Sequence, residues 1–560
     1  MSNKKNNIIL EEYENEFSYK KSKTNLNIQF NRIAFIFFVF FVISIIFSIQ
    51  LLHLGSLKKE NNIKSGPNIK NYRADIIDRN GNYLAKTVSS IDIGINPVEV
   101  IDKQRLLINL QLIFPSKDYF EVSKKLNQNN FFYIEKKISL ENYEKIMLLG
   151  DKSIKSEEKL TRIYPQKNLF SHIIGQIDDE NNGISGLEKS FDEKLKQIKE
   201  PLQLTVDTDI QFLIREELIK FHSVFRSKGS AVILMNVNNG EIISMVSYPD
   251  FDLNKRETVS DVNFINRATK GVYELGSVFK TFTVAAGLEE GLIETDTEFL
   301  NIEKKLKCGK NIISEYDKKI PSDLTVEQIL IRSGNIGSVR IGQKLEIKRL
   351  KLFLEKIGVL SKINFDIEEV GEPIPFRWGK CKLATVSFGH GITTTPLQIA
   401  KGYAIIANGG FEIKPSLIKK SLEDNQNKKR IIKEGVSKKI NKILRKIVTT
   451  EEGTAEFANI KGYEVGGKTG TAEKAIIGGY TRKAKVNTFV SIFPTSKPKY
   501  VMLVLLDEPK TSEDYIYKYK NKSGSYKGTP FNTAGWTSVE VAGKIIQRIG
   551  PILATKYTEN

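Results

Sequence analysis

The sequence predicts an α+β protein with a single transmembrane helix at its N-terminus. Three observations predict this class: an uncharged apolar segment near the start, a Lys- and Asn-rich region with short strand-like runs, and a longer region with strands at both ends and helices between them. We expect the early and late strands of that longer region to share one antiparallel sheet. The 560 residues, 40% of them hydrophobic, allow about three or four domains with a large core.

Composition narrows the class of protein further. With 9% aromatic residues, 16 Pro and 39 Gly, the chain is not disordered, collagen-like or a coiled coil. The net charge of +19 comes from lysines spread along the whole chain, so we expect no nucleic-acid partner. Cys308 and Cys381 are the two cysteines. Two cysteines so far apart cannot form a framework of several disulfides or a CxxC metal site. Whether they pair with each other is left open by the sequence.

The apolar segment is Ile33–Leu52, which contains no charged residue. It is long enough to cross a bilayer once and longer than the apolar core of about 7–15 residues in a cleaved signal peptide. No Ala-x-Ala-like cleavage site accompanies it. We therefore expect a retained anchor over residues 33–53, preceded by a tail of residues 1–32. Basic residues flank both ends, so the positive-inside rule does not decide the orientation.

Two regions follow the anchor. Residues 54–200 contain short β-type runs, and Asp78–Gly81, which reads Asp-Arg-Asn-Gly between two such runs, is a hairpin-turn signal. Residues 201–555 have a denser apolar periodicity and form the second predicted domain. We find no internal repeat at a fixed period.

The second region supplies the expected sheet. It begins with a predicted amphipathic helix, Val206–Phe221, and with two strands in Ser230–Pro249 joined by an Asn-Gly turn. Two further predicted strands, Val486–Phe493 and Tyr500–Glu508, come late, and a last helix lies within Ala534–Gly550. The middle is mostly helical.

One helix of this middle part has clear end signals. Thr395 is a good N-cap, followed by Pro at the first helical position and Gln at the third, and Gly409 and Gly410 end the helix. We interpret this stretch as structural. His390, which lies between two glycines, has no partner at metal-ligand spacing, and a hydrogen-bonded structural histidine is the favoured interpretation.

Three polar motifs of the second region carry the chemistry. The first is Ser277-Val-Phe-Lys280, in the expected first turn of a helix that ends before Gly291. Residues three apart on a helix share one face, so the Lys amine can serve as the base that a Ser nucleophile needs once its pKa is lowered. The spacing alone is weak evidence, because six other Ser-x-x-Lys tetrapeptides occur in the chain.

The second motif is Ser333-Gly334-Asn335. A hydroxyl and an amide two residues apart can point into one cleft, where the hydroxyl relays a proton and the amide holds a peptide carbonyl. The structural alternative is a helix cap or Asx turn.

The third motif is Lys468-Thr469-Gly470-Thr471, just before the late strands. A Lys and a Thr hydroxyl together can hold a substrate carboxylate, and glycine lets a substrate approach the strand closely.

In this order, the three motifs are the set shared by penicillin-binding proteins and class A β-lactamases. The chain resembles the class B penicillin-binding proteins, which are membrane-anchored peptidoglycan D,D-transpeptidases, and it is most similar to their division-specific, septal type. Gly334 departs from the family, which usually has a side chain between the Ser and the Asn. Further matching stretches are Tyr72–Ala85, Arg162–Glu188, Ser387–Gly410 and Thr533–Trp536.

The resemblance implies a mechanism and assigns site residues. Ser277 would be the nucleophile and Lys280 its base, and the backbone N–H groups of Ser277 and Thr471 would form the oxyanion hole. Ser333 and Lys468 would pass a proton to the leaving amine. The substrate-binding residues would be Asn335, Thr469, Gly470 and Thr471.

The resemblance also implies an architecture and partners. Residues 1–32 would be a cytoplasmic tail, residues 54–200 an elongated, non-catalytic pedestal of the dimerisation type, and residues 201–555 a periplasmic transpeptidase domain at the division septum of the inner membrane. The implied partners are peptidoglycan stem peptides, β-lactams as covalent inhibitors, a membrane glycan polymerase and division proteins. Ser/Lys acyl transfer needs no cofactor and no metal.

Three alternatives remain beside this interpretation. An elongation-type transpeptidase and a β-lactam sensor would share the fold. The third is a nucleotide-binding P-loop, because Gly462–Thr469 fits its pattern and Val501–Glu508 imitates the apolar strand that holds magnesium. The immediate Gly470 argues against the helix that a P-loop requires. A calcium loop at Asp178–Lys189 is rejected, because Lys189 stands where the bidentate Glu belongs.

Overall fold

The computed structural model describes residues 23–56, 72–255, 261–309, 311–419, 429–476 and 479–556. The chain divides into two compact units, Met1–Lys70 and Asn71–Asn560. Residues 1–22 of the predicted tail and residues 57–71 lie outside the described residues.

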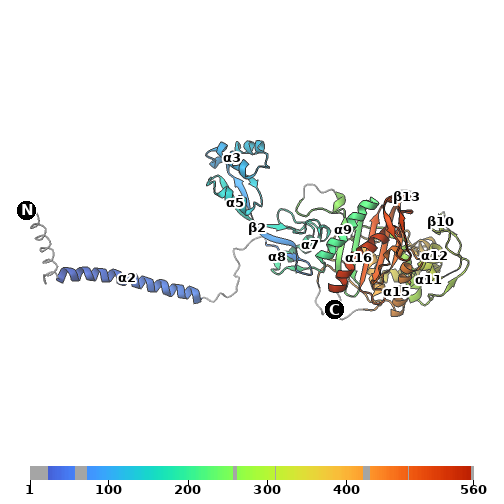
Figure 1. Cartoon of the computed structure of the whole chain (residues 1–560). Coiled ribbons are helices and arrows are strands. Elements are labelled where there is room, and N and C mark those ends of the chain that lie inside the picture. Colours follow the sequence, from blue (N-terminus) through green and yellow to red (C-terminus); the bar gives the residue numbers. More distant parts are fainter. Residues whose placement is uncertain are drawn as a thin grey trace, which may run out of the picture. The chain divides into compact units, whose positions relative to one another are not determined.

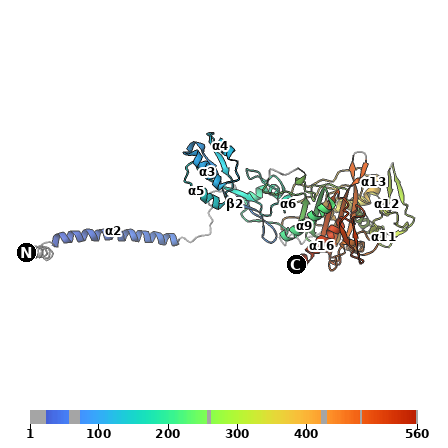
Figure 2. The same ribbon diagram turned by 45° about the horizontal axis from the view of Figure 1, so that its top comes forward.

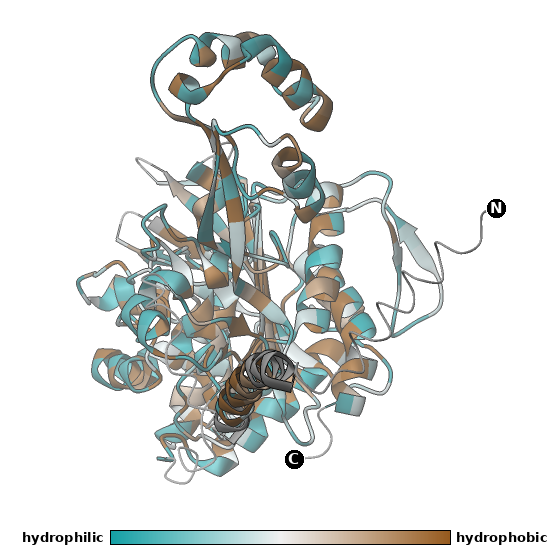
Figure 3. Cartoon of the chain, turned by 90° about the vertical axis from the view of Figure 1, so that its left-hand side faces the viewer, coloured by the Kyte–Doolittle hydropathy of each residue, from teal (hydrophilic) through white to brown (hydrophobic). Residues whose placement is uncertain are grey.

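The first unit contains the predicted membrane helix. Helix α2 (Lys23–Ser56) includes Ala34–Leu51, whose mean hydropathy is 2.7 and none of which is buried. Among the described residues it is the one helix long and apolar enough to cross a membrane. The described part of the helix is coloured as hydrophobic along its length (Figure 3), as is expected of a helix that faces lipid on all sides. The helix extends beyond the predicted span at both ends.

The second unit starts with a five-stranded sheet. Strand β2 (Tyr83–Ile95) pairs with its neighbours β1, β3 and β4, and β1 pairs in parallel with β5. The predicted hairpin at Asp78–Gly81 is confirmed, because β1 and β2 are antiparallel and the Asp78 carboxylate accepts from the backbone N–H groups of Asn80 and Asn82. The remaining strands of this sheet are β1 (Ile76–Ile77), β3 (Phe132–Glu135), β4 (Ile154–Ile163) and β5 (Leu202–Gln203).

Three helices gather at one end of β2 (Figure 2) and form a head with its own small core. Side chains such as Ile93, Leu110 and Ile146 are fully buried there, and this cluster is separate from the main core. The sequence did not predict this second core. The head helices are α3 (Lys103–Ile113), α4 (Tyr119–Leu126) and α5 (Leu140–Met147), and the 3-10 turn η2 (Pro97–Glu99) precedes them.

A buried ion network joins the pedestal stretches that resemble the family. The Glu188 carboxylate is fully buried and pairs with both Arg73 and Arg162, with 2.8 Å between Arg162 Nε and Glu188 Oε1. Arg73 Nη1 also lies 2.6 Å from Asp192 Oδ1. The short helices here are α6 (Ser171–Ile174), α7 (Gly186–Ser190) and α8 (Asp192–Gln197).

The predicted sheet of early and late strands is confirmed. Five antiparallel strands follow the order β12-β13-β14-β6-β7, so β12 is an edge strand. Helices α9 and α16 cover one face (Figure 1), and α14 packs on the other. The strands are β6 (Gly229–Asn236), β7 (Ile242–Tyr248), β12 (Gly466–Ile476), β13 (Gly479–Phe493) and β14 (Tyr500–Asp507).

The predicted helices are present with shifted ends. Helix α9 (Thr208–Phe225) begins after an Asp207 N-cap and runs four residues past the predicted end, and α16 (Ser538–Lys556) starts later and ends later than predicted. Helix α14 (Pro396–Ala407) has the predicted capping box between Thr395 and Gln398. The other helices are α10 (Lys280–Glu289), α11 (Val326–Ile331), α12 (Asn335–Lys356), α13 (Lys380–Val386) and α15 (Glu434–Thr449), with 3-10 turns η3 (Asp261–Phe264), η4 (Gly276–Phe279) and η6 (Glu456–Ala458).

Short strand pairs complete the unit. Hairpin β9–β10 lies beside α12, and a disulfide between Cys308 and Cys381 joins it to α13, which answers the open question of their pairing. The short strands are β8 (Glu298–Phe299), β9 (Lys305–Cys308), β10 (Asn311–Ser314), β11 (Leu324–Thr325), β15 (Ile516–Lys518) and β16 (Ser525–Lys527).

Candidate active site

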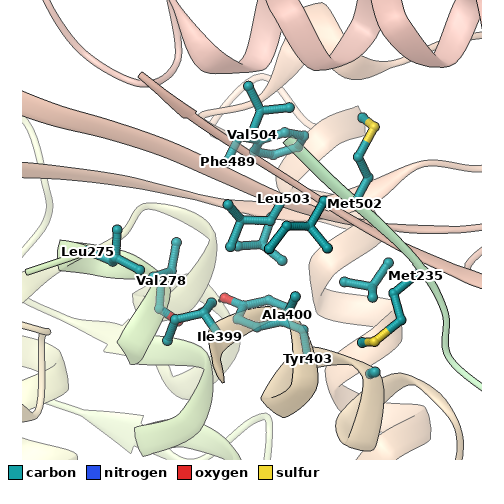
Figure 4. Packing of buried hydrophobic residues seen from close by; sticks show 14 of the residues in the cluster. Met235, Leu275, Val278, Ile399, Ala400, Tyr403, Phe489, Met502, Leu503 and Val504 are labelled. Carbon is teal, nitrogen blue, oxygen red and sulfur yellow. Dashed lines mark hydrogen bonds between the residues drawn. The ribbon is translucent and has the colours of Figure 1, made fainter. Parts of the chain in front are cut away.

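The turn that carries Ser277 is held by the main core. Leu275 and Val278 are fully buried and pack between the sheet and α14 (Figure 4). The Tyr403 hydroxyl on α14 donates to the Val278 carbonyl at 2.8 Å. Ser277 itself is half-buried in η4, directly before α10, so its hydroxyl lies at the edge of the core. The predicted helical turn is therefore a 3-10 turn that leads into the α-helix.

Lys280 begins α10 and is fully buried. Its ammonium group donates to the Ser333 carbonyl at 2.5 Å, to the Asn335 Oδ1 at 2.7 Å and to the Ser333 Oγ at 3.2 Å. Burial lowers the pKa of Lys280 to about 7, against the opposing effect of the Glu315 carboxylate. A neutral amine is therefore accessible near physiological pH, as a general base requires.

The Ser333-Gly334-Asn335 motif forms a corner between α11 and α12. Ser333 has a φ of 56°, in the left-handed region that few side chains adopt, and it is almost fully buried. Asn335 begins α12, and its Nδ2 donates to the Ser314 carbonyl at 2.9 Å. Gly334 has no steric reason to be glycine, because a Cβ there would meet no atom closer than 3.8 Å.

Lys468 approaches the same corner from β12. It is fully buried, and its ammonium group donates to Ser333 Oγ at 2.8 Å and to the Thr469 carbonyl at 3.1 Å. Burial, and then the nearby charge of Lys280, hold the pKa of Lys468 well below its usual range. Both lysines thus contact one hydroxyl group.

The rest of this motif runs along the sheet edge. Thr469 Oγ1 lies 2.7 Å from Thr454 Oγ1, and Thr471 Oγ1 accepts from the Ala534 N–H at 2.9 Å. A Cβ on Gly470 would lie 2.2 Å from the Leu275 carbonyl oxygen, so glycine here lets β12 pack against the nucleophile turn. The nucleotide-binding alternative is wrong, because Lys468 and Thr469 lie within a β-strand and not at the start of a helix.

His390 lies near this site but departs from its prediction. Its ring packs against Phe388 and Tyr480, and burial, followed by the charge of Lys280, lowers the pKa of His390 to about 4. The prediction that the His390 ring is hydrogen-bonded as a structural histidine is wrong for Nδ1, which has no hydrogen-bond partner among the described residues. With this pKa the ring is neutral at physiological pH and adds no further positive charge beside Lys280 and Lys468.

The sequence analysis missed two acidic residues of the site. Glu274 accepts from the Gly391 N–H at 3.0 Å and from the Tyr480 hydroxyl at 3.0 Å, and burial raises the pKa of its carboxyl group. Glu315 caps α12. Glu274 lies three residues before Ser277, and Glu315 lies twenty residues before Asn335. Neither position belongs to a sequence pattern that distinguishes it from a surface carboxylate.

Comparisons with known proteins show the family to which the chain belongs. Residues 230–530 match the family model of the penicillin-binding protein transpeptidase domain, and residues 68–218 match that of the penicillin-binding protein dimerisation domain. The chain is 31% identical over 501 residues to the probable peptidoglycan D,D-transpeptidase FtsI of Caulobacter vibrioides, covering 87% of this chain and 82% of that protein. It is 29% identical over 502 residues to stage V sporulation protein D of Bacillus subtilis, covering 82% and 77%.

A solved structure shares the fold. Penicillin-binding protein 3 of Mycobacterium tuberculosis, complexed with aztreonam, superposes with a TM-score of 0.64 at 20% identity and covers 85% of this chain and 96% of that one.

Proposed function

This chain belongs to the penicillin-binding protein transpeptidase family, and on that basis we propose that it is a peptidoglycan D,D-transpeptidase that cross-links stem peptides during septal cell-wall synthesis. The observation that carries the proposal is the meeting of Lys280 and Lys468 on the Ser333 hydroxyl, next to the turn that bears Ser277. This arrangement provides a nucleophile, a base of lowered pKa and a route for a proton.

The first half of the reaction forms an acyl-enzyme. Neutral Lys280 takes the proton of the Ser277 hydroxyl, and Oγ attacks the carbonyl between the two terminal D-alanines. The new C–O bond forms, the C–N bond breaks, and Ser333 and Lys468 deliver a proton to the departing D-alanine amine. The backbone N–H groups of Ser277 and Thr471 stabilise the tetrahedral oxyanion, where the loss of one donor typically costs ~3–4 kcal/mol.

The substrate lies along the free edge of β12. An edge strand offers unpaired backbone groups to an extended peptide. Asn335 holds the donor peptide and Thr469 binds its terminal carboxylate, while Gly470 and Thr471 keep the strand close to Ser277. An acceptor amine of a neighbouring stem peptide then attacks the ester, forms the cross-linking amide and releases Ser277. β-Lactams react with Ser277 as covalent inhibitors, because they imitate D-Ala-D-Ala.

The proposed setting is the division septum. The septal role rests on the likeness to the FtsI protein, and an elongation-type transpeptidase or a β-lactam sensor is the alternative role for the same fold. Residues 33–53 anchor the chain in the inner membrane, residues 54–200 form the pedestal, and residues 201–555 form the periplasmic catalytic domain. A membrane glycan polymerase and division proteins are the proposed partners.

The test is the mass of the intact protein after incubation with benzylpenicillin. We expect a stable gain of one penicillin in the wild type and none in Ser277→Ala. A wild type without an adduct indicates a degenerate scaffold, or a β-lactamase if the drug is consumed, and either result contradicts the proposal. Release of D-alanine and cross-linked product from glycan strands separates a transpeptidase from a sensor.

A second test addresses the anchor. Without residues 1–53, the protein should stay in solution without detergent and still react with penicillin. A requirement for detergent would contradict the single-anchor interpretation.

A further inference from the structure

Glu315 follows strand β10 and reaches the start of α12. Its two carboxylate oxygens accept from the backbone N–H groups of Asn335 at 2.7 Å and Ile336 at 2.8 Å. The N-cap residue, Gly334, has no side chain to satisfy these donors. The cap of α12 therefore comes from another segment of the chain.

One of the two capped residues, Asn335, contacts Lys280. Asn335 Oδ1 accepts from Lys280 Nζ at 2.7 Å, and the side chain of Asn335 is held from the other side by the Ser314 carbonyl, next to Glu315. Ser333 sits in a left-handed conformation that its surroundings must maintain. The end of β10 thus fixes the corner on which both lysines converge.

The segment that carries Glu315 is itself braced. The Cys308–Cys381 disulfide ties hairpin β9–β10 to α13. Helix α13 leads to Ser387, whose carbonyl accepts from the Thr283 hydroxyl on α10 at 2.8 Å. The disulfide therefore ties the hairpin to α13, and a hydrogen bond ties the end of α13 to the helix that follows Ser277.

We propose that Glu315 is a positioning residue for acylation of Ser277, which holds the Ser333–Asn335 corner against Lys280, and that the Cys308–Cys381 disulfide braces it. This inference rests on the proposed function. The charge of Glu315 also acts on Lys280, because it opposes the burial that lowers the pKa of that amine. The other charged or titratable groups that act on Lys280 or respond to its charge are Lys468 from β12 and His390 after α13.

The test compares Glu315→Gln and Glu315→Asp with wild type and with Glu303→Gln. Glu303 precedes the same hairpin and makes only a half-exposed pair with Arg340, so its variant removes the same charge without touching the corner. The measurements are the second-order rate constant of acylation by a fluorescent penicillin from pH 5.5 to 9.5, and the melting temperature.

For Glu315→Gln we expect a plateau rate about tenfold or more below wild type, since each N–H group donates to a different carboxylate oxygen and one of these atoms becomes an NH2 donor in glutamine. We also expect the midpoint of its acid limb to move to lower pH, because the loss of a nearby negative charge lowers the pKa of Lys280. Glu315→Asp, which keeps the charge, should restore the midpoint, and Glu303→Gln should match wild type. The Cys308→Ser/Cys381→Ser double variant should lower the plateau with an unchanged midpoint.

Glu315 has no positioning role if Glu315→Gln keeps the wild-type plateau and midpoint, or if its slower acylation follows the melting temperature while the midpoint stays. A wild-type plateau in the double cysteine variant overturns the brace. Failure of the wild type itself to acylate would contradict the proposed function instead, so the two failures are distinguishable.

Discussion

The strongest quantitative consequence of the site is the pH dependence of acylation. Lys280 is fully buried, and its pKa is about 7 in place of the usual 10.5. In the proposed mechanism the neutral amine is the base, so its population sets the rate. That population rises from about 9% at pH 6 to about 91% at pH 8, so the acylation rate constant should increase about tenfold over this interval and then level off.

The assay is stopped-flow acylation with a fluorescent penicillin between pH 5.5 and 9.5, and the carboxylate of the drug stays ionised throughout. An unshifted lysine would instead give a rate that climbs about tenfold per pH unit up to about pH 10. Such a climb, or a flat profile between pH 6 and 8, would refute the assignment of Lys280 as the base. Lys280→Ala should lose acylation while its circular dichroism spectrum stays that of the wild type. Normal acylation in this folded variant would also refute the assignment of Lys280 as the base.

Three further variants test the packing at the site and the buried ion network around Glu188. Gly334→Ser should keep wild-type acylation and gain about 0.5 kcal/mol in the free energy of unfolding. The nearest atom to an added Cβ would be 3.8 Å away, and serine is a better N-cap than glycine. Slower acylation would show that the corner tolerates no side chain. Gly470→Ala should slow acylation about 100-fold, because its Cβ would lie 2.2 Å from the Leu275 oxygen and push the strand from the nucleophile turn; a wild-type rate would contradict that close approach. Glu188→Gln should lower the free energy of unfolding by about 3 kcal/mol or more, because it leaves two buried arginines without their shared carboxylate. An unchanged midpoint of urea unfolding would contradict a stabilising role of this network.

The sequence predicted those parts of the structure that depend on neighbouring residues. The capping box of α14 needs only Thr395 and Gln398, three positions apart, and the hairpin at Asp78–Gly81 needs four consecutive residues. The sheet was predicted because strands buried on both faces read as continuous apolar runs. That the early and late strands share one antiparallel sheet was expected from the positions of these runs at the two ends of the region.

The parts that could not be predicted join distant residues through polar groups. Glu188 meets Arg73 across 115 positions, and Glu315 meets Asn335 across 20, with no periodicity to announce either pair. The separate core of the head was missed because its helices are short, so that few of their residues are buried. The ring nitrogen of His390 without a partner is a property of three-dimensional packing alone.

The chemistry of the Ser-x-x-Lys motif likewise depends on the residues that the fold brings to it and not on the spacing of its serine and lysine. Ser416 and Lys419 have the same spacing, yet that lysine is exposed to water. Lys280 and Lys468 instead converge on Ser333 from 53 and 135 positions away, in a site without room for their hydration shells. Burial lowers the pKa of both amines, and the charge of Lys280 lowers that of Lys468 further. The proposed base, a neutral Lys280 that deprotonates Ser277, therefore depends on the fold that brings the three motifs together.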